Sequence, residues 1–199
     1  MSASEAKAYK ALSCLLEKHT GQTLMANRHW RIDMALKPVM RQNSIPGPLL
    51  DSIRENRLAS KRMRIWSAAC STGQEAYSLA MAFAEVIERM PRYRKCTLQV
   101  FASDLSPDAI AAARLGQYPL SISDAVSPER LSQFFTTHNG NYRIAKHIRD
   151  TVLFAQHDVI LDPPFTKLDL LCCRNLMIYF DSALQRRLLP LFHYSLRSG

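Results

Sequence analysis

The sequence lacks the features that mark several large classes of protein. It has no run of about 18 apolar residues, so a membrane-spanning helix is not expected. Its N-terminus, MSASEAKAYK, lacks the basic-then-apolar order of a secretory signal. The five cysteines are odd in number and form no CxxC pair, which argues against a disulfide framework and a zinc site. We therefore expect a cytoplasmic protein with reduced, mostly buried thiols and no bound metal.

Glycine is also scarce, with 6 residues in 199, and the usual phosphate-binding glycine motifs are missing. The segment IWSAACSTGQEAYSLAM begins like a buried strand, continues with small residues and then acquires helical spacing. Its turn contains one glycine, Gly73, and neither GxGxxG nor GxxxxGK[ST]. The turn also lacks Lys and Arg, and acidic Glu75 follows it. These absences argue against a nucleoside triphosphate or a pyrophosphate as the ligand.

Positive charge is concentrated at the start of the chain. The net charge is +9, and residues 1–64 contain twelve Lys or Arg against five Asp or Glu, a balance of +7. We expect residues 1–60 to form a small helical domain, with Arg28 and Arg31 one turn apart on a polar helix face. Such a surface suits a nucleic acid, a membrane face or an acidic protein, although a solvated basic helix explains the charge equally well.

From residue 61 onward, strand and helix patterns alternate along the chain. This order predicts an α/β doubly wound domain with a mostly parallel sheet over residues 61–199. The fourth strand is apolar apart from Asp169, so we expect it to be central in the sheet. The predicted strands cover residues 64–68, 97–103, 151–155 and 168–172, and the predicted helices cover residues 74–89, 106–115 and 181–196.

Polar residues gather where these apolar strands end. Glu75 follows the first strand, Asp104 ends the second, and Asp158 and Arg174 follow the third and fourth. Ligands of doubly wound domains bind beyond the carboxyl ends of the strands, and an acid after the second strand commonly accepts hydrogen bonds from ribose hydroxyls. Taken singly, Glu75 is explained equally well as a helix-start acid and Asp104 as a cap. Together they favour a nucleoside with a positively charged tail, such as S-adenosylmethionine.

Three segments resemble successive signatures of the CheR family: IWSAACSTGQEAYSLAM, FASDLSPDAIAAARLGQYP and DLLCCRNLMIYFD. Members of that family have a Rossmann-like domain and use S-adenosylmethionine to methylate glutamate side chains of methyl-accepting chemotaxis proteins. The segment LLEKHTGQTLMANRHWRIDMALKPVMRQNSI is similar to the family's small all-α N-terminal domain. The resemblance implies a protein-glutamate O-methyltransferase of chemosensory adaptation, with S-adenosylmethionine as cofactor and S-adenosylhomocysteine as product.

The resemblance also implies roles for single residues. Glu75 is similar to the acid that takes the amino group of the cofactor, and Asp104 to the ligand of the ribose. Arg174 and Tyr179 correspond to residues that line the methyl-transfer end, although spacing alone also explains Tyr179 as a core aromatic. The cofactor-binding residues that the resemblance implies are Ser71, Thr72, Gly73, Glu75, Asp104, Leu105, Asp158, Val159 and Asn175.

The resemblance gives the basic N-terminal segment a target. The methylated helices of chemoreceptors are acidic, so Arg28 and Arg31 are expected to bind them. We expect no nucleic acid partner, no membrane insertion and a monomer.

Two departures from the family pattern are expected to matter. Family members carry a longer N-terminal domain and a stretch like TxFFRD before the first strand, which is missing between Ile45 and Met63. They also continue with a strand like GGxLFLGHSE, whereas this sequence stops at Gly199. We therefore expect a shortened helical domain, a C-terminally incomplete methyltransferase domain and weakened cofactor binding.

Two other functions stay open at this point. A degenerate module could bind cofactor or receptor without transferring a methyl group. The tetrapeptide DPPF at residues 162–165 is like the catalytic loop of DNA amino-methyltransferases. That loop should follow the strand next to the first one, however, and here another apolar strand comes after it. The sequence leaves open which receptor is modified and whether residues 139–148 form a β-excursion that docks a receptor tail.

Overall fold

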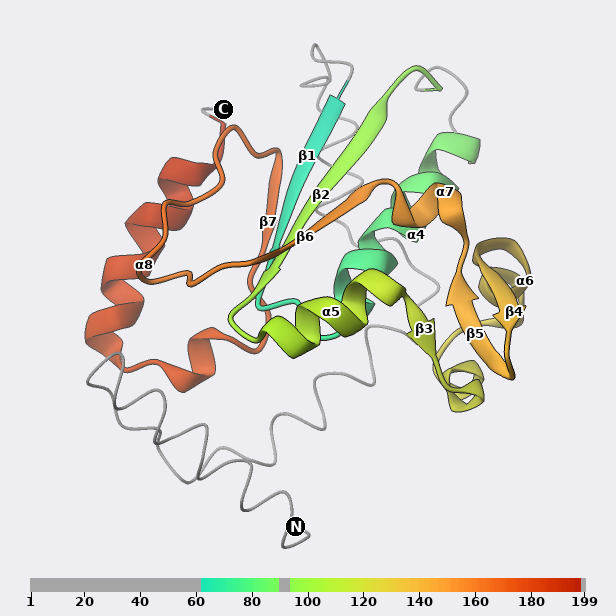
Figure 1. Ribbon diagram of the computed structural model, residues 1–199. Coiled ribbons are helices and arrows are strands. Elements are labelled where there is room, and N and C mark those ends of the chain that lie inside the picture. Colours follow the sequence, from blue (N-terminus) through green and yellow to red (C-terminus); the bar gives the residue numbers. More distant parts are fainter. Residues whose placement is uncertain (1–61, 90–93, 198–199) are drawn as a thin grey trace, which may run out of the picture.

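The structure, a computed structural model, describes residues 62–89 and 94–197 (Figure 1). The predicted helical domain of residues 1–60, with Arg28 and Arg31, therefore lies outside the described residues. Four parallel strands form the main sheet in the order β6-β2-β1-β7. All four were predicted, with bounds within two residues of those observed. The strands are β1 (Arg62–Ala68), β2 (Thr97–Asp104), β6 (Val152–Gln156) and β7 (Leu170–Cys172).

Helices cover both faces of this sheet because the strands carry apolar side chains on both faces. Ile65 and Val100 belong to one buried cluster, together with residues of α4 (Gln74–Arg89) and α5 (Pro107–Leu115). Trp66, the next residue along β1, belongs to a second buried cluster with residues of α8 (Ser182–Ser195). Successive side chains of a strand point to opposite faces, so the two clusters lie on opposite sides of the sheet. The predicted doubly wound α/β class is confirmed.

The fourth strand is not central in the described sheet. Within residues 62–197, β7 pairs only with β1, and β1 and β2 occupy the interior positions. The apolar character of β7 has another cause, because the strand is covered on both faces. Leu170 packs against the first buried cluster and Leu171 against the second. Burial on both faces makes an edge strand as apolar as a central one, so the expected central position is not seen within residues 62–197.

The helices begin where capping chemistry predicts. Ser106 is the N-cap of α5, and its hydroxyl accepts a hydrogen bond from the amide of Ala109 at 3.2 Å. Asp181 caps α8 in the same way, accepting from the amide of Leu184 at 2.8 Å. All three predicted helices are confirmed within one residue at each end. Among the described helices, none is both long enough and apolar enough to cross a membrane.

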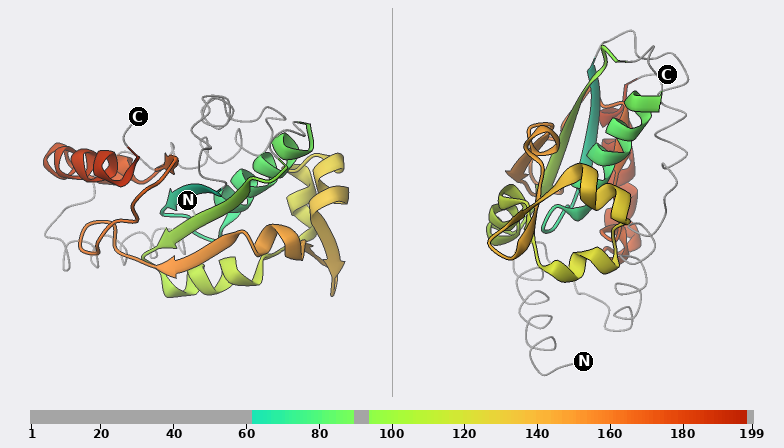
Figure 2. Two further views of the ribbon diagram at one scale, coloured as in Figure 1. Left: turned by 90° about the horizontal axis from the view of Figure 1, so that it is seen from above. Right: turned by 90° about the vertical axis from the view of Figure 1, so that its right-hand side faces the viewer.

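Between α5 and β6 the chain forms a small antiparallel sheet, in the order β3-β5-β4, that the sequence analysis did not predict. It lies at the opposite end of the molecule from α8 (Figures 1 and 2). Its second hairpin strand, β5, falls within residues 139–148, the stretch whose structure the sequence left open. The elements here are β3 (Gln117–Tyr118), η3 (Leu120–Asp124), α6 (Pro128–Phe134), β4 (Phe135–His138), β5 (Asn141–Ile144) and α7 (Lys146–Arg149).

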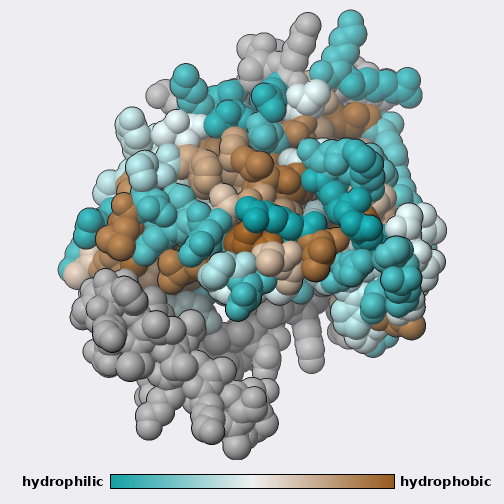
Figure 3. All heavy atoms as spheres, in the orientation of Figure 1, coloured by the Kyte–Doolittle hydropathy of each residue, from teal (hydrophilic) through white to brown (hydrophobic). Residues whose placement is uncertain are grey.

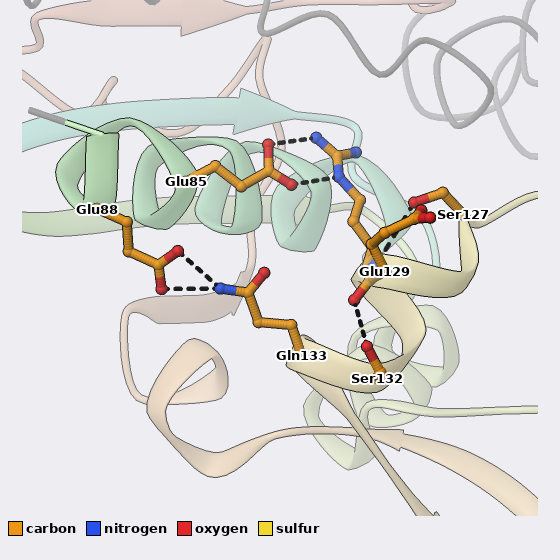
Figure 4. Close-up of polar contacts among 7 residues, drawn as sticks. Glu85, Glu88, Ser127, Glu129, Ser132 and Gln133 are labelled. Carbon is orange, nitrogen blue, oxygen red and sulfur yellow. Dashed lines mark hydrogen bonds and ion pairs between the residues drawn. The ribbon is translucent and has the colours of Figure 1, made fainter.

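Polar contacts join α6 to α4 (Figure 4). Arg130 donates two hydrogen bonds to the carboxylate of Glu85, at 2.6 and 2.9 Å, in a bidentate arrangement. The two side chains are only 11% and 13% exposed. On the neighbouring exposed turn, the amide nitrogen of Gln133 donates to both carboxylate oxygens of Glu88 at 2.8 and 2.9 Å. The small sheet is thereby attached to the helix that carries Glu75.

Candidate functional site

The carboxyl ends of the four parallel strands meet at one edge of the sheet. The register aligns Asp104 of β2 with Gln156 of β6, and Ser67 of β1 with Cys172 of β7. The loops that leave these positions therefore start side by side, as the sequence analysis expected. The segments brought to this edge are residues 69–75, 104–106, 157–159 and 173–175.

Asp104 joins two of these loops. Its Oδ2 accepts a hydrogen bond from the amide of Ser71 at 2.8 Å, and its Oδ1 accepts one from the amide of Ser106 at 2.9 Å. Asp104 is not the cap of α5, because Ser106 has that role; its carboxylate instead holds the loops at the strand ends. An ionised carboxylate has about four lone-pair sites, so two remain for a ligand hydroxyl.

Glu75 lies in the first turn of α4, largely shielded from solvent with 21% of its side chain exposed. Its Oε1 accepts a hydrogen bond from the hydroxyl of Ser67 at 2.8 Å, and Nε of Arg174 lies 3.9 Å from its Oε2. Burial raises the pKa of this carboxyl above its ordinary value of 4.5, and the Ser67 hydrogen bond and the Arg174 charge oppose that rise. A second cation in contact with this carboxylate would stabilise its ionised form further.

The loop between β1 and α4 has an unusual backbone. Ala69 and Ser71 have positive φ angles of 58° and 50°, although neither is glycine, and Gly73 has φ 90°. Non-glycine residues in this region are strained and cluster at ligand sites. Packing within the protein requires a glycine at residue 73, because a Cβ there would lie 3.0 Å from Cζ of Phe154. The glycine thus allows the loop to pack directly against the Phe154 ring of the core.

Two contacts of this site have no signal in the sequence. The hydroxyl of Tyr118, in β3, donates to the carbonyl of Thr72 at 2.9 Å across 46 residues of chain. Ser67, which binds Glu75, looks like an ordinary small residue of an apolar strand. Both contacts depend on residues that only the folded chain brings together, so sequence reasoning could not find them.

Three cysteines surround the site as neutral thiols. Burial, together with negative charge on nearby carboxylates, raises the pKa of Cys70 and Cys172 to about 12 and that of Cys173 to about 11. They act as small apolar residues near neutral pH. Within residues 62–89 and 94–197, no group of three or more His, Cys, Asp or Glu side chains is arranged to hold a metal ion.

Apolar side chains also reach the surface near the strand ends. Hydrophobic residues gather across the middle of the face shown in Figure 3, bordered by hydrophilic ones. Leu105 and Leu161, on the loops after β2 and β6, are 53% and 68% exposed. The side-chain amide of Gln156 donates to the carbonyl of Leu105 at 3.3 Å, which links the two loops. An exposed leucine after Asp104 can cover one face of a planar base.

Asp158 and Val159 have local structural tasks in the loop after β6. Oδ1 of Asp158 accepts from the amides of Ile160 and Leu161 at 2.8 and 3.3 Å, which makes it the organiser of a turn. Val159 is half-buried against the second cluster. The structure brings both to the strand ends, but one oxygen of Asp158 is already engaged.

The DPPF tetrapeptide is accounted for by packing. Phe165 stacks on Phe101 with ring centroids 4.9 Å apart and meets Trp66 edge-on at 5.2 Å. Its ring is therefore part of the second cluster. The loop also precedes β7, the described neighbour of β1 on that side, so it does not occupy the position that a base-flipping loop requires.

Arg174 and Asn175 follow β7, and Tyr179 ends the short helix η4 (Met177–Tyr179). The side chain of Arg174 is 40% exposed and faces Glu75 across the edge of the sheet. Asn175 has a positive φ of 56°, which turns the chain sharply after Arg174. Tyr179 is half-buried against the second cluster, so its ring contributes to packing whether or not its hydroxyl also has a role in the site.

A separate pocket lies between α4 and the small sheet. Its lining includes Tyr77 and Met81 of α4, Tyr118 of β3 and Phe135 of β4. None of Glu75, Asp104 and Arg174 lines it. The chemistry of the charged residues places the candidate site at the strand ends and not in this pocket.

The residues at the strand ends fit S-adenosylmethionine. Asp104 keeps lone pairs for the ribose hydroxyls, Leu105 exposes apolar surface for the adenine, and the buried Glu75 carboxylate suits the cationic amino group. No Lys or Arg lies in residues 69–75, where a pyrophosphate would need one.

Comparison with known proteins also indicates a domain that binds S-adenosylmethionine. Residues 40–199 match the family described as "CheR methyltransferase, SAM binding domain". An uncharacterised 104.1 kDa protein of Rhodobacter capsulatus is 40% identical over 151 residues, which are 76% of this chain and 16% of that protein. Chemotaxis protein methyltransferase 1 of Pseudomonas aeruginosa is 36% identical over 174 residues, covering 85% of this chain and 61% of that protein.

Among solved structures, the glycopeptide N-methyltransferase MtfA superposes with a TM-score of 0.41 at 17% identity, over 68% of this chain and 46% of its own. We draw nothing from so weak a likeness. The chain spans less than two thirds of the length of the two curated relatives named above. Because the match extends over most of the sequence and includes the strand-end site, the chain belongs to the CheR methyltransferase family, as its S-adenosylmethionine-binding domain.

Proposed function

We propose that this chain is a cytoplasmic, S-adenosylmethionine-dependent protein-glutamate O-methyltransferase that modifies methyl-accepting chemotaxis proteins. The observation that carries the proposal is the placement of two carboxylates, Glu75 and Asp104, around one loop at the sheet edge. Relatives such as chemotaxis protein methyltransferase 1 support the chemosensory context. In this proposal residues 61–199 are the methyltransferase domain, and residues 1–60 are a small helical domain.

The cofactor would be held by the loops at the strand ends. Glu75 takes the amino group, Asp104 the ribose hydroxyls, and Leu105 one face of the adenine. Asp158 meets the adenine edge with the carboxylate oxygen that its turn leaves open, and Val159 backs its face. Ser71, Thr72, Gly73 and Asn175 support the amino-acid tail, and the positive φ angles of Ser71, Gly73 and Asn175 turn the backbone there.

The reaction needs little acid-base chemistry from the protein. When bound, S-adenosylmethionine supplies an electrophilic methyl group on its sulfonium. A substrate glutamate has an ordinary pKa of about 4.3 and is already ionised at neutral pH, so no general base is required. Arg174 and Tyr179 hold the substrate carboxylate in line with the methyl group and shape the pocket around it. Orientation and exclusion of water then carry most of the rate enhancement.

The substrate is recognised by charge. Acidic receptor helices suit the basic N-terminal segment, where Arg28 and Arg31 are the proposed contacts. Charge reversal at these two positions should weaken receptor binding, most strongly at low salt. The chain works as a monomer in this scheme, because one copy supplies every residue assigned above.

Calorimetric titration with S-adenosylhomocysteine tests the cofactor part of the proposal. A saturable one-to-one isotherm that is lost in Glu75→Gln supports it, whereas the absence of any binding would overturn it. Transfer is tested separately, with methyl-labelled S-adenosylmethionine and receptor cytoplasmic fragments. Base-labile label on fragments with Glu at the modified positions, and none on matched Gln fragments, is the expected result. Binding without transfer would instead favour a module that holds cofactor but does not react.

A further inference from the structure

Ser67 lies in the middle of the sheet, directly beneath the candidate site. It is a residue of β1 with no exposed surface, and its hydroxyl is 2.8 Å from Oε1 of Glu75. A hydroxyl buried at this depth costs free energy unless it is paired, and here its partner is an ionisable side chain of the following helix. The contact joins two residues 8 positions apart and links the end of β1 to the first turn of α4 within the protein interior.

The other buried serines show that this pairing is unusual for the fold. Within the described residues, the buried polar residues are Ser67, Ser103 and Ser195. Ser103 accepts from Nε1 of Trp66 at 2.9 Å, and Ser195 donates to the carbonyl of Leu191 at 2.8 Å. Both of those contacts satisfy uncharged groups. Ser67 is the buried serine of this set that meets a carboxylate.

The surroundings of Glu75 explain what the hydroxyl does. Burial favours the neutral form of the carboxyl, and Ser67 and Arg174 favour the ionised form. Nε of Arg174 is 3.9 Å away, beyond hydrogen-bond range, whereas Ser67 is in direct contact. The other titratable neighbours are Cys70, Cys172 and Cys173, whose neutral thiols give Glu75 no positive charge.

We propose that Ser67 is a positioning residue, which fixes one oxygen of Glu75 from below so that an ionised carboxylate presents its other oxygen to the amino group of the cofactor. This inference rests on the proposed function, because it takes Glu75 as the acid that binds that group. The inference separates the roles of the two carboxylates: Ser67 acts on recognition of the amino-acid tail and has no effect on recognition of the adenosine part.

The test compares two ligands across a pH series. S-Adenosylhomocysteine has the amino-acid tail, and 5′-methylthioadenosine lacks it. Ser67→Ala should weaken binding of S-adenosylhomocysteine about tenfold at neutral pH, the loss of one hydrogen bond to a charged group, and leave methylthioadenosine affinity unchanged. The pH at which S-adenosylhomocysteine affinity reaches its plateau should also move upward, because one group that stabilises the ionised carboxylate is gone.

Ser195→Ala is the matched control, since it removes an equally buried hydroxyl far along the chain in α8. Ser67→Cys, with a weak donor of similar size, replaces the alanine variant if that variant does not fold. Equal losses for both ligands, or an unchanged pH profile, would overturn the inference and make Ser67 a purely structural residue. If the wild-type protein binds neither ligand, it is the proposed function that fails.

Discussion

The amide of Ser71 donates a hydrogen bond to Oδ2 of Asp104 at 2.8 Å, so the acid at the end of β2 closes the loop that follows β1. Ser71 has a φ of 50°, a conformation that costs a non-glycine residue about 1–3 kcal/mol. The other oxygen of Asp104 accepts from the amide of Ser106. One carboxylate therefore holds two loops in place before any ligand is present, and it still has lone pairs for the ribose.

Asp104→Asn should damage stability and binding together. The amide nitrogen of the asparagine would face one of the two backbone N–H donors, and an unsatisfied pair of this kind costs about 1–3 kcal/mol. We expect a lower thermal midpoint and at least a tenfold loss of S-adenosylhomocysteine affinity by calorimetry. Asp108→Asn, in the exposed first turn of α5, is the control and should change neither by much. An Asp104→Asn protein that binds as tightly as wild type would contradict the ribose assignment.

Gly73→Ala should destabilise the fold more than a glycine substitution elsewhere with the same backbone strain. A Cβ at residue 73 would lie 3.0 Å from the Phe154 ring, and φ is positive. Gly140 also has positive φ, +70°, but a Cβ there would meet nothing within 4 Å. Both alanine variants carry the backbone penalty, so their difference measures the clash, which we expect to be about 1–3 kcal/mol. Urea unfolding gives both values. Equal losses would show that the loop is not seated on Phe154.

The sequence predicted those parts of the fold that are set by local pattern. Strands β1 and β2 and helices α4 and α5 have apolar periodicity with capping or turn residues between them, such as Ser106 before α5. The meeting of Glu75, Asp104 and Arg174 at one edge then follows from parallel pairing alone.

The parts that were missed depend on partners distant in sequence. The strands of the small sheet have two to four residues each, too few to show a period, and they exist because they pair with one another. The Tyr118 contact with Thr72 needs that sheet to be in place first. For β7, composition reports burial on two faces but not the number of neighbouring strands, so its place in the described sheet could not be inferred.

Glu85→Gln should loosen the small sheet from the main domain. It leaves the guanidinium of Arg130, whose side chain is 11% exposed, beside a neutral amide. Loss of a shielded, bidentate ion pair of this kind should cost about 1–3 kcal/mol, measured by urea unfolding. Glu88→Gln, one turn further along α4 and exposed, should cost less than about 0.5 kcal/mol. If the two variants were equally stable, the Arg130 contact would not be what holds α6.

Affinity for S-adenosylhomocysteine should rise with pH through the titration of Glu75. Burial raises the pKa of this carboxyl above 4.5, so part of the free protein is protonated there at mildly acidic pH. A cationic amino group favours the ionised form, so binding lowers this pKa and must release a proton wherever Glu75 was protonated. Affinity therefore increases as pH rises through the titration of Glu75, and it levels off once the free protein is fully ionised at this residue.

Calorimetry in two buffers of different ionisation enthalpy counts the released proton directly. Glu75→Gln should lower affinity on the plateau and remove both the slope and the proton release. The exposed Glu88→Gln serves again as the control, with a wild-type profile expected. A slope of opposite sign, or one that survives in Glu75→Gln, would mean that another group controls the pH dependence.

Tyr179→Phe should separate methyl transfer from cofactor binding. Tyr179 lies in η4, five residues after Arg174, and its ring packs against the second buried cluster while its hydroxyl is the group proposed to orient the substrate carboxylate. Phenylalanine keeps the ring and its packing, so stability should be unchanged and S-adenosylhomocysteine affinity should stay within about twofold of wild type. Turnover should fall at least tenfold, because the rate depends on the orientation of the substrate carboxylate. Tyr194→Phe removes a hydroxyl from a side chain of α8 that is 73% exposed, and it should leave turnover unchanged. A large loss of cofactor affinity in Tyr179→Phe would place its hydroxyl among the cofactor contacts. Unchanged turnover would mean that Tyr179 has only a packing role.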